Sequence, residues 1–224
     1  AGIGINNFWT WIEMEPVGEQ ADIITSTTNF LEAFNPYYIA GDAPSRVTEL
    51  VWDRLMRIGR DGLPEPWAAE SVEWESDTSV VVTLREGMTW HDGEAVTAED
   101  VKFSFDSIQT GEAPQYSAFV QAVDGVEIIY YLSVRIALSE PSAAFEVATL
   151  AKLNLVPEHI WGPIIADLQT QDDANAEDIQ EEIPVGSGPY RMVAYDVNEF
   201  VILERNENYF AAPKAERWIM NVLP

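Results

Sequence analysis

The sequence predicts an α/β protein, because segments with the alternation of β-strands are interleaved with segments that have helical spacing. Strand patterns occur at 23–28, 72–85, 126–138 and 190–203. Helical spacing occurs at 45–55, 97–108 and 142–153. The 224 residues, of which 47% are hydrophobic, suffice for one good-sized domain or two small ones.

The strand pattern is clearest at 79–85. Val80, Val82 and Leu84 point to one side there and Val81, Thr83 and Arg85 to the other, so one face of the strand is expected to lie in a core. Ser76-Asp77 separates this run from the preceding strand and predicts a hairpin. The runs 190–195 and 199–203 predict a second hairpin, entered through a turn with Gly186, Gly188 and Pro189.

The predicted helices begin at residues that can cap a helix. Ser45 is placed to cap the first helix, and Ser142 the third. Thr97 with Asp100 predicts a capping box, in which each residue binds the backbone of the other. The helix that follows Thr97 carries Val101, Phe105 and Ile108 on one face, which predicts its buried side.

The charge balance excludes several classes of partner. The chain has 38 acidic residues against 12 lysines and arginines, a formal net charge of −26. Such a field repels nucleic acids and anionic membrane surfaces, so neither is expected to bind. No apolar run reaches the length of about 18 residues that a membrane helix needs. The absence of cysteine excludes disulfides, thiolate metal sites and a cysteine nucleophile.

Catalytic and metal-binding patterns are weak. His91, Asp92 and His159 could be imagined as the ligands of a metal-dependent hydrolase, but the histidines are not at helical or hairpin spacing. We expect instead that His91 and Asp92 cap nearby backbone groups in a turn. The sequence contains neither a GxSxG nucleophile motif nor a phosphate-binding loop. We therefore expect no enzyme activity, no metal and no cofactor.

Three tyrosines lie in predicted loops. Tyr37, Tyr38 and Tyr116 are compatible with a concave site lined by rings and backbone groups. Partial burial at a rim is an equally good interpretation of each ring taken singly. The Gly186 to Pro189 turn is a rigid loop of the kind that often forms a binding wall at the edge of a sheet.

Four separated segments resemble one known family. They are ELVWDRLMRIGRDGLPEPWAAESVEW, LREGMTWHDGEAVTAEDVKFSF, LVPEHIW and PVGSGPYRMVAYDVNEFVILERNENYF, in the family's order. The chain is similar to the extracellular solute-binding proteins of peptide and nickel ABC importers, the dipeptide and oligopeptide-binding family. The resemblance covers residues 22–224. The EIIYYLSVRIAL region lacks the usual Asp or Gly at its central turn, which leaves the geometry of that hairpin open.

The resemblance implies the architecture. The fold would be the mixed-sheet lobe of a class II, peptide-binding type of periplasmic-binding-protein-like fold, with an inserted α+β subdomain. Residues 1–52 and 183–224 would form a discontinuous mixed-sheet subdomain of lobe I, and residues 53–182 the inserted subdomain. Lobe II would be absent from this chain, so these residues would hold half of a ligand cleft.

The resemblance also implies the function. The protein would capture oligopeptides, or a similar solute, between two lobes and deliver them to a membrane permease. By position, the ligand-facing residues would be Tyr37, Tyr38, Ile39, Tyr116, Gly186, Ser187 and Gly188. The protein would be a monomer at the cell surface, anchored to the membrane through a removed N-terminal segment. A nickel chelate, haem, glutathione or an oligosaccharide are alternative solutes, and a ligand sensor is an alternative role.

The uniform excess of acidic residues predicts a protein that needs salt. At about 1 M salt the Debye length falls to roughly 3 Å, which screens the mutual repulsion of the carboxylates. We therefore expect the fold to melt when salt falls below about 0.5 M. Thermal unfolding followed by circular dichroism across a salt series checks this expectation, and a melting temperature that does not change on desalting would contradict it.

Overall fold

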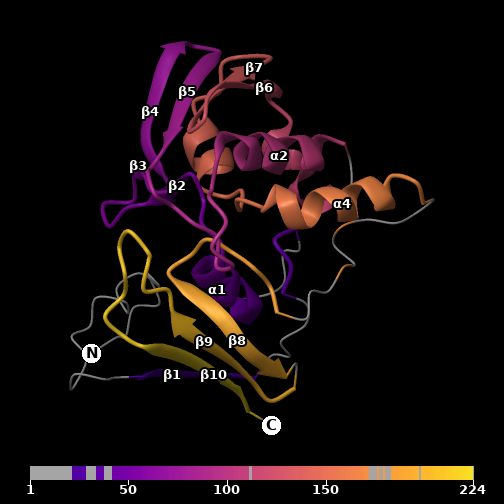
Figure 1. The fold of residues 1–224 in the computed structure, drawn as a ribbon. Helices are drawn as coiled ribbons and strands as arrows, with labels where there is room; N and C mark the ends of the chain where they lie inside the picture. The colour runs from indigo at the N-terminus through magenta and orange to yellow at the C-terminus, as the bar shows by residue number, and fades with distance from the viewer. Residues whose placement is uncertain are drawn as a thin grey trace.

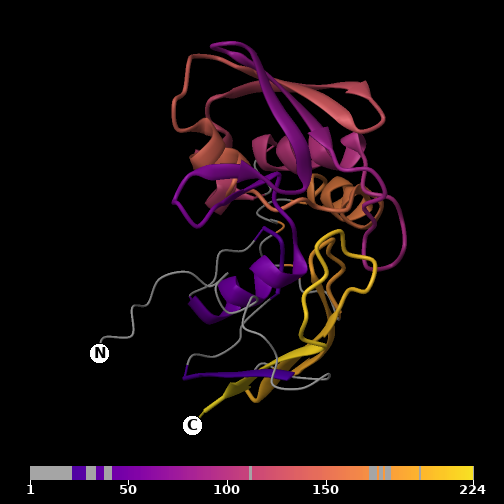
Figure 2. The same ribbon diagram turned by 90° about the vertical axis from the view of Figure 1, so that its left-hand side faces the viewer.

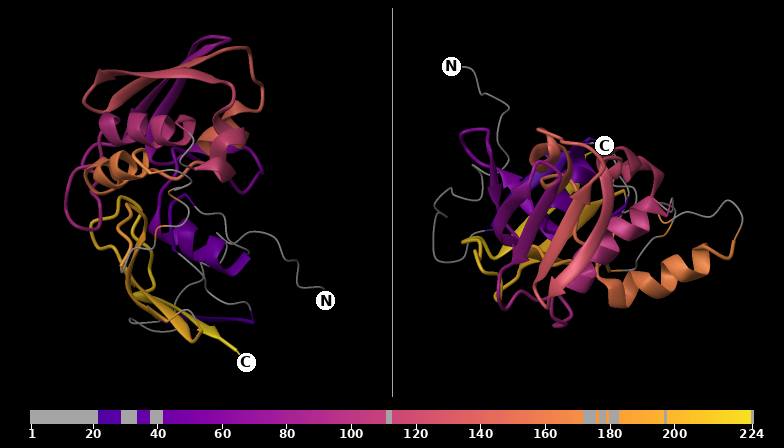
Figure 3. Two further views of the ribbon diagram at one scale, coloured as in Figure 1. Left: turned by 90° about the vertical axis from the view of Figure 1, so that its right-hand side faces the viewer. Right: turned by 90° about the horizontal axis from the view of Figure 1, so that it is seen from above.

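The computed structural model describes residues 22–28, 34–37, 42–110, 113–171, 176, 179, 183–196 and 198–223. Two four-stranded sheets lie at opposite ends of the molecule, with the helices between them (Figures 1, 2 and 3). Each sheet buries one face against a helix, so the architecture is the α/β type that the sequence predicts.

The lower sheet of Figure 1 is mixed. Its strands are β1 (Asp22–Thr27), β10 (Arg217–Val222), β9 (Phe200–Arg205) and β8 (Tyr190–Asp196), in that order. β1 and β10 are parallel, and the other pairs are antiparallel. α1 (Asp42–Val51) covers one face of this sheet. We call the buried cluster between them the α1 core; it contains Phe34, Val47, Leu50, Val51, Trp52, Tyr190, Met192, Val201, Leu203, Trp218 and Met220.

The upper sheet is antiparallel. Its strands are β4 (Ala69–Ser76), β5 (Ser79–Leu84), β7 (Ser133–Leu138) and β6 (Val123–Tyr130), in that order. Val80, Val82 and Leu84 are at most 1% exposed, which confirms the predicted inward face of β5. α2 (Ala98–Gln109) covers this face and brings Val101, Phe105 and Ile108 into the same cluster, which we call the α2 core.

The start of α2 forms as the sequence predicts. The Thr97 backbone N–H donates to Asp100 Oδ2 at 2.8 Å, and the Thr97 hydroxyl accepts from the Glu99 N–H at 3.2 Å. The other Asp100 oxygen accepts from the Glu158 N–H at 3.0 Å. One buried carboxylate therefore satisfies donors at the starts of two helices, α2 and α4 (Glu158–Leu168).

Short elements connect these layers. They are β2 (Met56–Ile58), β3 (Pro64–Pro66), the 3₁₀ turn Pro114–Tyr116, α3 (Ser117–Val120) and the π-helical turn Glu146–Leu150. Among the described residues, no helix combines the length and the apolar character needed to cross a membrane.

Three predictions about elements need correction or completion. The first helix spans 42–51 rather than 45–55, because the chain leaves the helix at Trp52 to run between the two cores. The helix predicted over 142–153 is reduced to a π-helical turn at 146–150, where the Ala151 N–H donates to the Glu146 carbonyl five residues earlier. The hairpin of β6 and β7 closes without Asp or Gly in its turn, and a register shift precedes Tyr130.

The segment Val51 to Leu55 is the crossing point of the fold. The Val51 carbonyl accepts from the Gly188 N–H at 2.8 Å, and the Asp53 carbonyl from the Leu155 N–H at 2.8 Å. The Leu55 carbonyl accepts from the N–H groups of Trp67 and Ala69, at 2.9 and 3.0 Å. Stretches that are far apart in the sequence are thus held around five residues.

Two glycines allow the closest of these approaches. A Cβ on Gly186 would overlap the Val51 carbonyl oxygen, and a Cβ on Gly188 would lie 2.5 Å from the Leu50 carbonyl oxygen. Backbone oxygens cannot rotate away as a flexible side chain can. The glycines of the PVGSGPY segment are therefore required by backbone packing against the end of α1.

We expect Gly186→Ala to destabilise the fold by about 3 kcal/mol or more, because the added methyl group must separate two backbones. Gly125→Ala is the matched control, since a Cβ on Gly125 meets no atom within 4 Å. Chemical unfolding of both variants measures the difference. A Gly186→Ala protein as stable as the Gly125→Ala protein would contradict this packing.

Candidate functional site

The structure brings two of the predicted ligand loops together. The side-chain amide of Asn154 donates to the Pro36 carbonyl at 3.0 Å and to the Tyr116 hydroxyl at 3.2 Å. The Asn35 amide donates to the carbonyls of Ala176 and Ile179, each at 2.6 Å. Asn154 therefore fixes the 34–37 loop against the 114–116 turn, and Asn35 fixes the same loop against residues 176 and 179; both asparagines are buried.

The rings of these loops are more buried than predicted. Tyr37 is 1% exposed and Tyr116 5% exposed, and both belong to the α2 core. The Tyr37 hydroxyl donates to Ser107 Oγ at 2.9 Å, and its ring meets Trp161 edge to face with 5.0 Å between centroids. The expectation that these rings lie away from a core face is wrong. Tyr37 packs against residues of α2 and α4, and Tyr116 packs against Phe119 of α3 and accepts from Asn154.

Burial changes what these tyrosines can do. A ring that is almost fully covered and hydrogen-bonded inward supports its loop and has little surface to offer a solute. Contact of Tyr37 or Tyr116 with a ligand stays a prediction. Tyr38 and Ile39, the other predicted ligand residues of the first loop, lie outside the described residues.

The Gly186 to Gly188 turn is also buried, and His91 holds it. The backbone N–H of His91 donates to the Gly186 carbonyl at 2.8 Å, and the ring nitrogen Nδ1 of His91 accepts from the Gly186 N–H at 3.2 Å. With Nδ1 as acceptor, the ring proton resides on Nε2, which lies 3.0 Å from the Gly188 carbonyl. Neutral His91 therefore bonds three backbone groups of the turn, one through its own backbone N–H and two through its ring.

The surroundings of His91 favour this neutral form. Burial lowers the pKa of His91 to about 4, and Arg191 acts in the same direction. The hydrogen bond to the Gly188 carbonyl and the charge of Asp92 oppose the shift. The prediction that His91 caps local backbone is thus wrong, since its partners are 95 or more residues away in the chain. The neighbouring Asp92 does act locally and accepts from the Glu94 N–H at 3.1 Å.

The structure brings together two of the three residues considered for a metal site. His159 Nε2 lies 2.7 Å from Asp92 Oδ2 on the surface. Burial alone would raise the pKa of Asp92, but the bonds from His159 and the Glu94 N–H hold it below its usual value. Both ring nitrogens of His91 are engaged with the turn. No group of three potential metal ligands is present in the part of the chain that the structure describes.

A buried carboxylate that sequence reasoning missed lies beside the same turn. Asp53 is 3% exposed, and its Oδ1 accepts from the Tyr209 hydroxyl at 2.6 Å. The Tyr209 hydroxyl in turn accepts from Trp67 Nε1 at 2.8 Å. Asp53 Oδ2 and Ser187 Oγ are buried without a hydrogen bond of regular geometry among the described residues. The available signal was a lone acid inside the apolar run LVWDRLM.

Burial makes the charge of Asp53 unfavourable. It raises the pKa of Asp53 to about 7, although the neighbouring Tyr209, Ser187 and Trp67 favour the ionised form. The same burial raises the pKa of Tyr209 well above its usual value, assisted by the charge of Asp53. Asp53 thus exchanges a proton near neutral pH in the middle of the crossing point.

We expect Asp53→Asn to change how stability depends on pH. The folded-state pKa of Asp53 lies above its unfolded value of 3.8. Its contribution to stability is therefore present below that value and is lost as pH rises to about 7, by on the order of 4 kcal/mol. Asparagine cannot ionise, so the melting temperature of the variant relative to wild type should rise between about pH 4 and pH 7 and level off above that.

Asp77→Asn is the control for this experiment, because Asp77 lies exposed in the turn between β4 and β5. Its melting temperature should keep a constant offset from wild type across the same pH range. A constant offset for Asp53→Asn as well would show that Asp53 has an ordinary pKa.

Comparisons with known proteins agree with this fold. The family model described as "Bacterial extracellular solute-binding proteins, family 5 Middle" matches residues 64–224. The uncharacterized protein YejA of Escherichia coli (strain K12) is 30% identical over 210 residues, which cover 92% of this chain and 33% of YejA. The chain spans about a third of the length of the curated relatives it matches.

Solved structures share this fold. The oligopeptide-binding protein AppA of Bacillus subtilis, in complex with a nonapeptide, superimposes with a TM-score of 0.79 at 22% identity, over 94% of this chain and 41% of AppA. NikZ of Campylobacter jejuni, in complex with Ni(L-His), gives a TM-score of 0.76 at 25% identity, over 90% of this chain and 39% of NikZ. Because the family model matches most of its length, this chain belongs to the bacterial extracellular solute-binding proteins of family 5.

Proposed function

We propose that these residues form one lobe of the extracellular solute-binding component of an ABC importer, which captures oligopeptides or a similar solute. The observation that carries the proposal is the family match over 64–224, together with a fold shared with a nonapeptide-binding relative. Closure of a second lobe over the solute would present it to a membrane permease. The role proposed is capture and release, with no chemical change of the solute.

The proposed lobe has two parts, residues 1–52 with 183–224 and residues 53–182. The separate α1 and α2 cores support this division, since each core lies against its own sheet. Tyr37 connects the two parts, because it belongs to the first part and packs in the α2 core. Such a contact would make the two parts move together as one lobe.

The proposed ligand face lies over the 34–37 and 114–116 loops, which Asn154 holds together. Because the Tyr37 and Tyr116 rings are buried, their part would be to fix the loop backbones, while neighbouring Tyr38 and Ile39 would meet the solute. The buried Gly186 to Gly188 turn would likewise position the wall of the cleft from behind. This arrangement suits a site that binds extended solutes through backbone groups and water, with little dependence on side chains.

A nickel chelate is a second candidate solute, because a relative of the same fold was solved with Ni(L-His). The described residues offer no cluster of metal ligands, so such a complex would have to be recognised through its organic part.

The test is native mass spectrometry of the longer protein that contains both lobes, purified without refolding. We expect a co-purified peptide, and the 224 residues alone should bind the same peptide at least about a hundredfold more weakly in titration calorimetry, because half of the cleft is missing. Micromolar binding by the 224 residues alone would contradict the half-cleft, and a non-peptide solute would redirect the proposal to that solute class.

A further inference from the structure

Asn154 bonds to both loops of the proposed ligand face, and its side-chain amide must keep one orientation to do so. Its Nδ2 group donates to the Pro36 carbonyl at 3.0 Å and to the Tyr116 hydroxyl at 3.2 Å. A carbonyl oxygen can only accept, so Nδ2 rather than Oδ1 has to lie toward Pro36. If the amide were turned over, two acceptor oxygens would meet and the 34–37 loop would lose this bond.

Arg54 requires the same orientation from the other end of the amide. Its Nε donates to Asn154 Oδ1 at 3.3 Å, and the backbones of the two residues form an isolated antiparallel bridge. A guanidinium has donors and no acceptor, so only the oxygen of the amide can lie toward it. Asn154 is 3% exposed, so bulk water cannot readily replace either partner. The bond from Arg54 therefore favours the orientation that holds the loops.

The guanidinium of Arg54 is itself fixed. Its Nη1 donates to Glu49 Oε1 of α1 at 3.1 Å and to the Ala151 carbonyl at 3.5 Å. A planar guanidinium can make such bonds on several nitrogens at once, whereas lysine has a single ammonium group. Arg54 thus links α1 to the segment that ends at Asn154.

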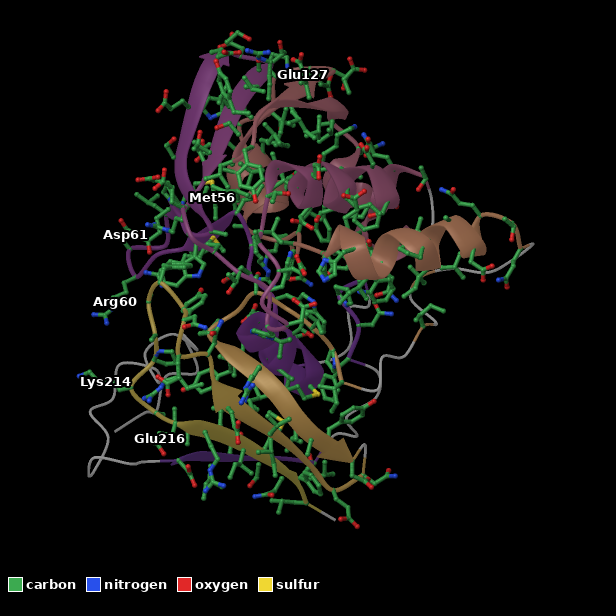
Figure 4. The ribbon with its side chains drawn as sticks, in the orientation of Figure 1. Met56, Arg60, Asp61, Glu127, Lys214 and Glu216 are labelled. Atoms are coloured by element: carbon green, nitrogen blue, oxygen red, sulfur yellow. The ribbon has the colours of Figure 1, made fainter. Side chains whose placement is uncertain are left out.

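Arg54 is not one of the residues expected to face the solute. It belongs to the crossing point, two residues before Met56, with which β2 begins in the upper part of the molecule (Figure 4). It lines a cavity of about 250 Å³ together with Glu49, and none of the predicted ligand residues within the described part of the chain lines this cavity. A partly exposed arginine is therefore bonded, through one buried amide, to both loops.

We propose that Arg54 is a positioning residue for solute binding. It orients the Asn154 amide, and this amide sets how the 34–37 loop lies against the 114–116 turn. The inference rests on the proposed function, because it concerns the loops that would bind the solute. Arg54 acts on the solute only through these loops, so its loss loosens both of them and weakens binding.

The test compares Arg54→Lys with Arg135→Lys in the longer protein that contains both lobes, in about 1 M KCl. Arg54→Lys keeps the positive charge and removes the Nε donor that lies toward Asn154. Arg135→Lys is the matched control, because Arg135 also pairs with two partners, Glu75 and Glu127. This pairing is on the upper sheet, and Glu127 lies at the top of the molecule (Figure 4). Melting temperatures establish that each variant is folded.

Two measurements distinguish the variants. Hydrogen exchange followed by mass spectrometry reports how readily the 34–37 and 114–116 backbones open, and it needs no solute. Fluorescence anisotropy with a labelled nonapeptide of alanine and serine reports affinity. We expect Arg54→Lys to speed exchange in both segments and to weaken peptide binding, each roughly fivefold, because a buried hydrogen bond is lost. Arg135→Lys should stay within about twofold of wild type in both measurements.

A double-mutant cycle tests whether Arg54 acts through Asn154. Asn154→Leu keeps a similar shape and removes both ends of the link, so adding Arg54→Lys to it should change exchange and affinity less than twofold. Effects that multiply would make Arg54 an independent stabilising residue and overturn the proposal. Equal effects of Arg54→Lys and Arg135→Lys would overturn it too. If Asn154→Leu does not fold, the exchange of the two loops in Arg54→Lys decides.

Failure of the proposed function would look different. A wild-type protein that binds no peptide would contradict peptide capture, and hydrogen exchange would still decide the role of Arg54. Faster exchange of the 34–37 and 114–116 segments in Arg54→Lys alone would support the positioning role. Unchanged exchange in these segments would overturn it.

Discussion

The close approach of the Gly186 to Gly188 turn to the end of α1 is the constraint on which the rest of this lobe depends. The chain leaves the lower layer at Val51, builds the whole upper layer, and returns at Gly186 to the residues it left. Because carbonyl oxygens of Leu50 and Val51 occupy the space that side chains would need, only glycine lets the returning strand lie this close. β8 then begins in register with β9, and the lower sheet closes.

Polar side chains stabilise this crossing point without exposing it to water. His91, Asp53 and Asn154 each come from a different segment, and each satisfies groups that would otherwise be buried without partners. His91 does so as a neutral base and Asp53 as an acid with a raised pKa, so burial disfavours charge at both positions. The two residues therefore make stability depend on pH in opposite directions. Low pH protonates His91 and high pH ionises Asp53, and each change weakens the crossing point.

The same geometry links fold to function. Asn154 ties the predicted ligand loops to each other, and Leu155, the next residue, ties them to Asp53 through its backbone. Loops held in this way rest on a rigid base, which suits the proposed role in solute binding. Trp67, which lies between β3 and β4, donates to the Tyr209 hydroxyl and so extends the Tyr209–Asp53 hydrogen bonds from the crossing point.

Local patterns in the sequence determined the elements, and tertiary structure determined their partners. The alternation in β5 and the capping box of Thr97 and Asp100 predicted a buried face and a helix start, because both depend on neighbours within a few residues. The helix predicted after Ser142 is wrong, since only a π-helical turn forms there, with the Ala151 N–H bonded to the Glu146 carbonyl. Tyr37 and Tyr116 lie in predicted loops but are part of the core, because residues from distant segments, among them Trp161 and Asn154, pack on them or bond to them. The sequence alone thus determined the family resemblance, the acidic composition and most strands and helices. The tertiary structure decided which residues are buried at the crossing point, because contacts over 90 or more residues leave no local pattern.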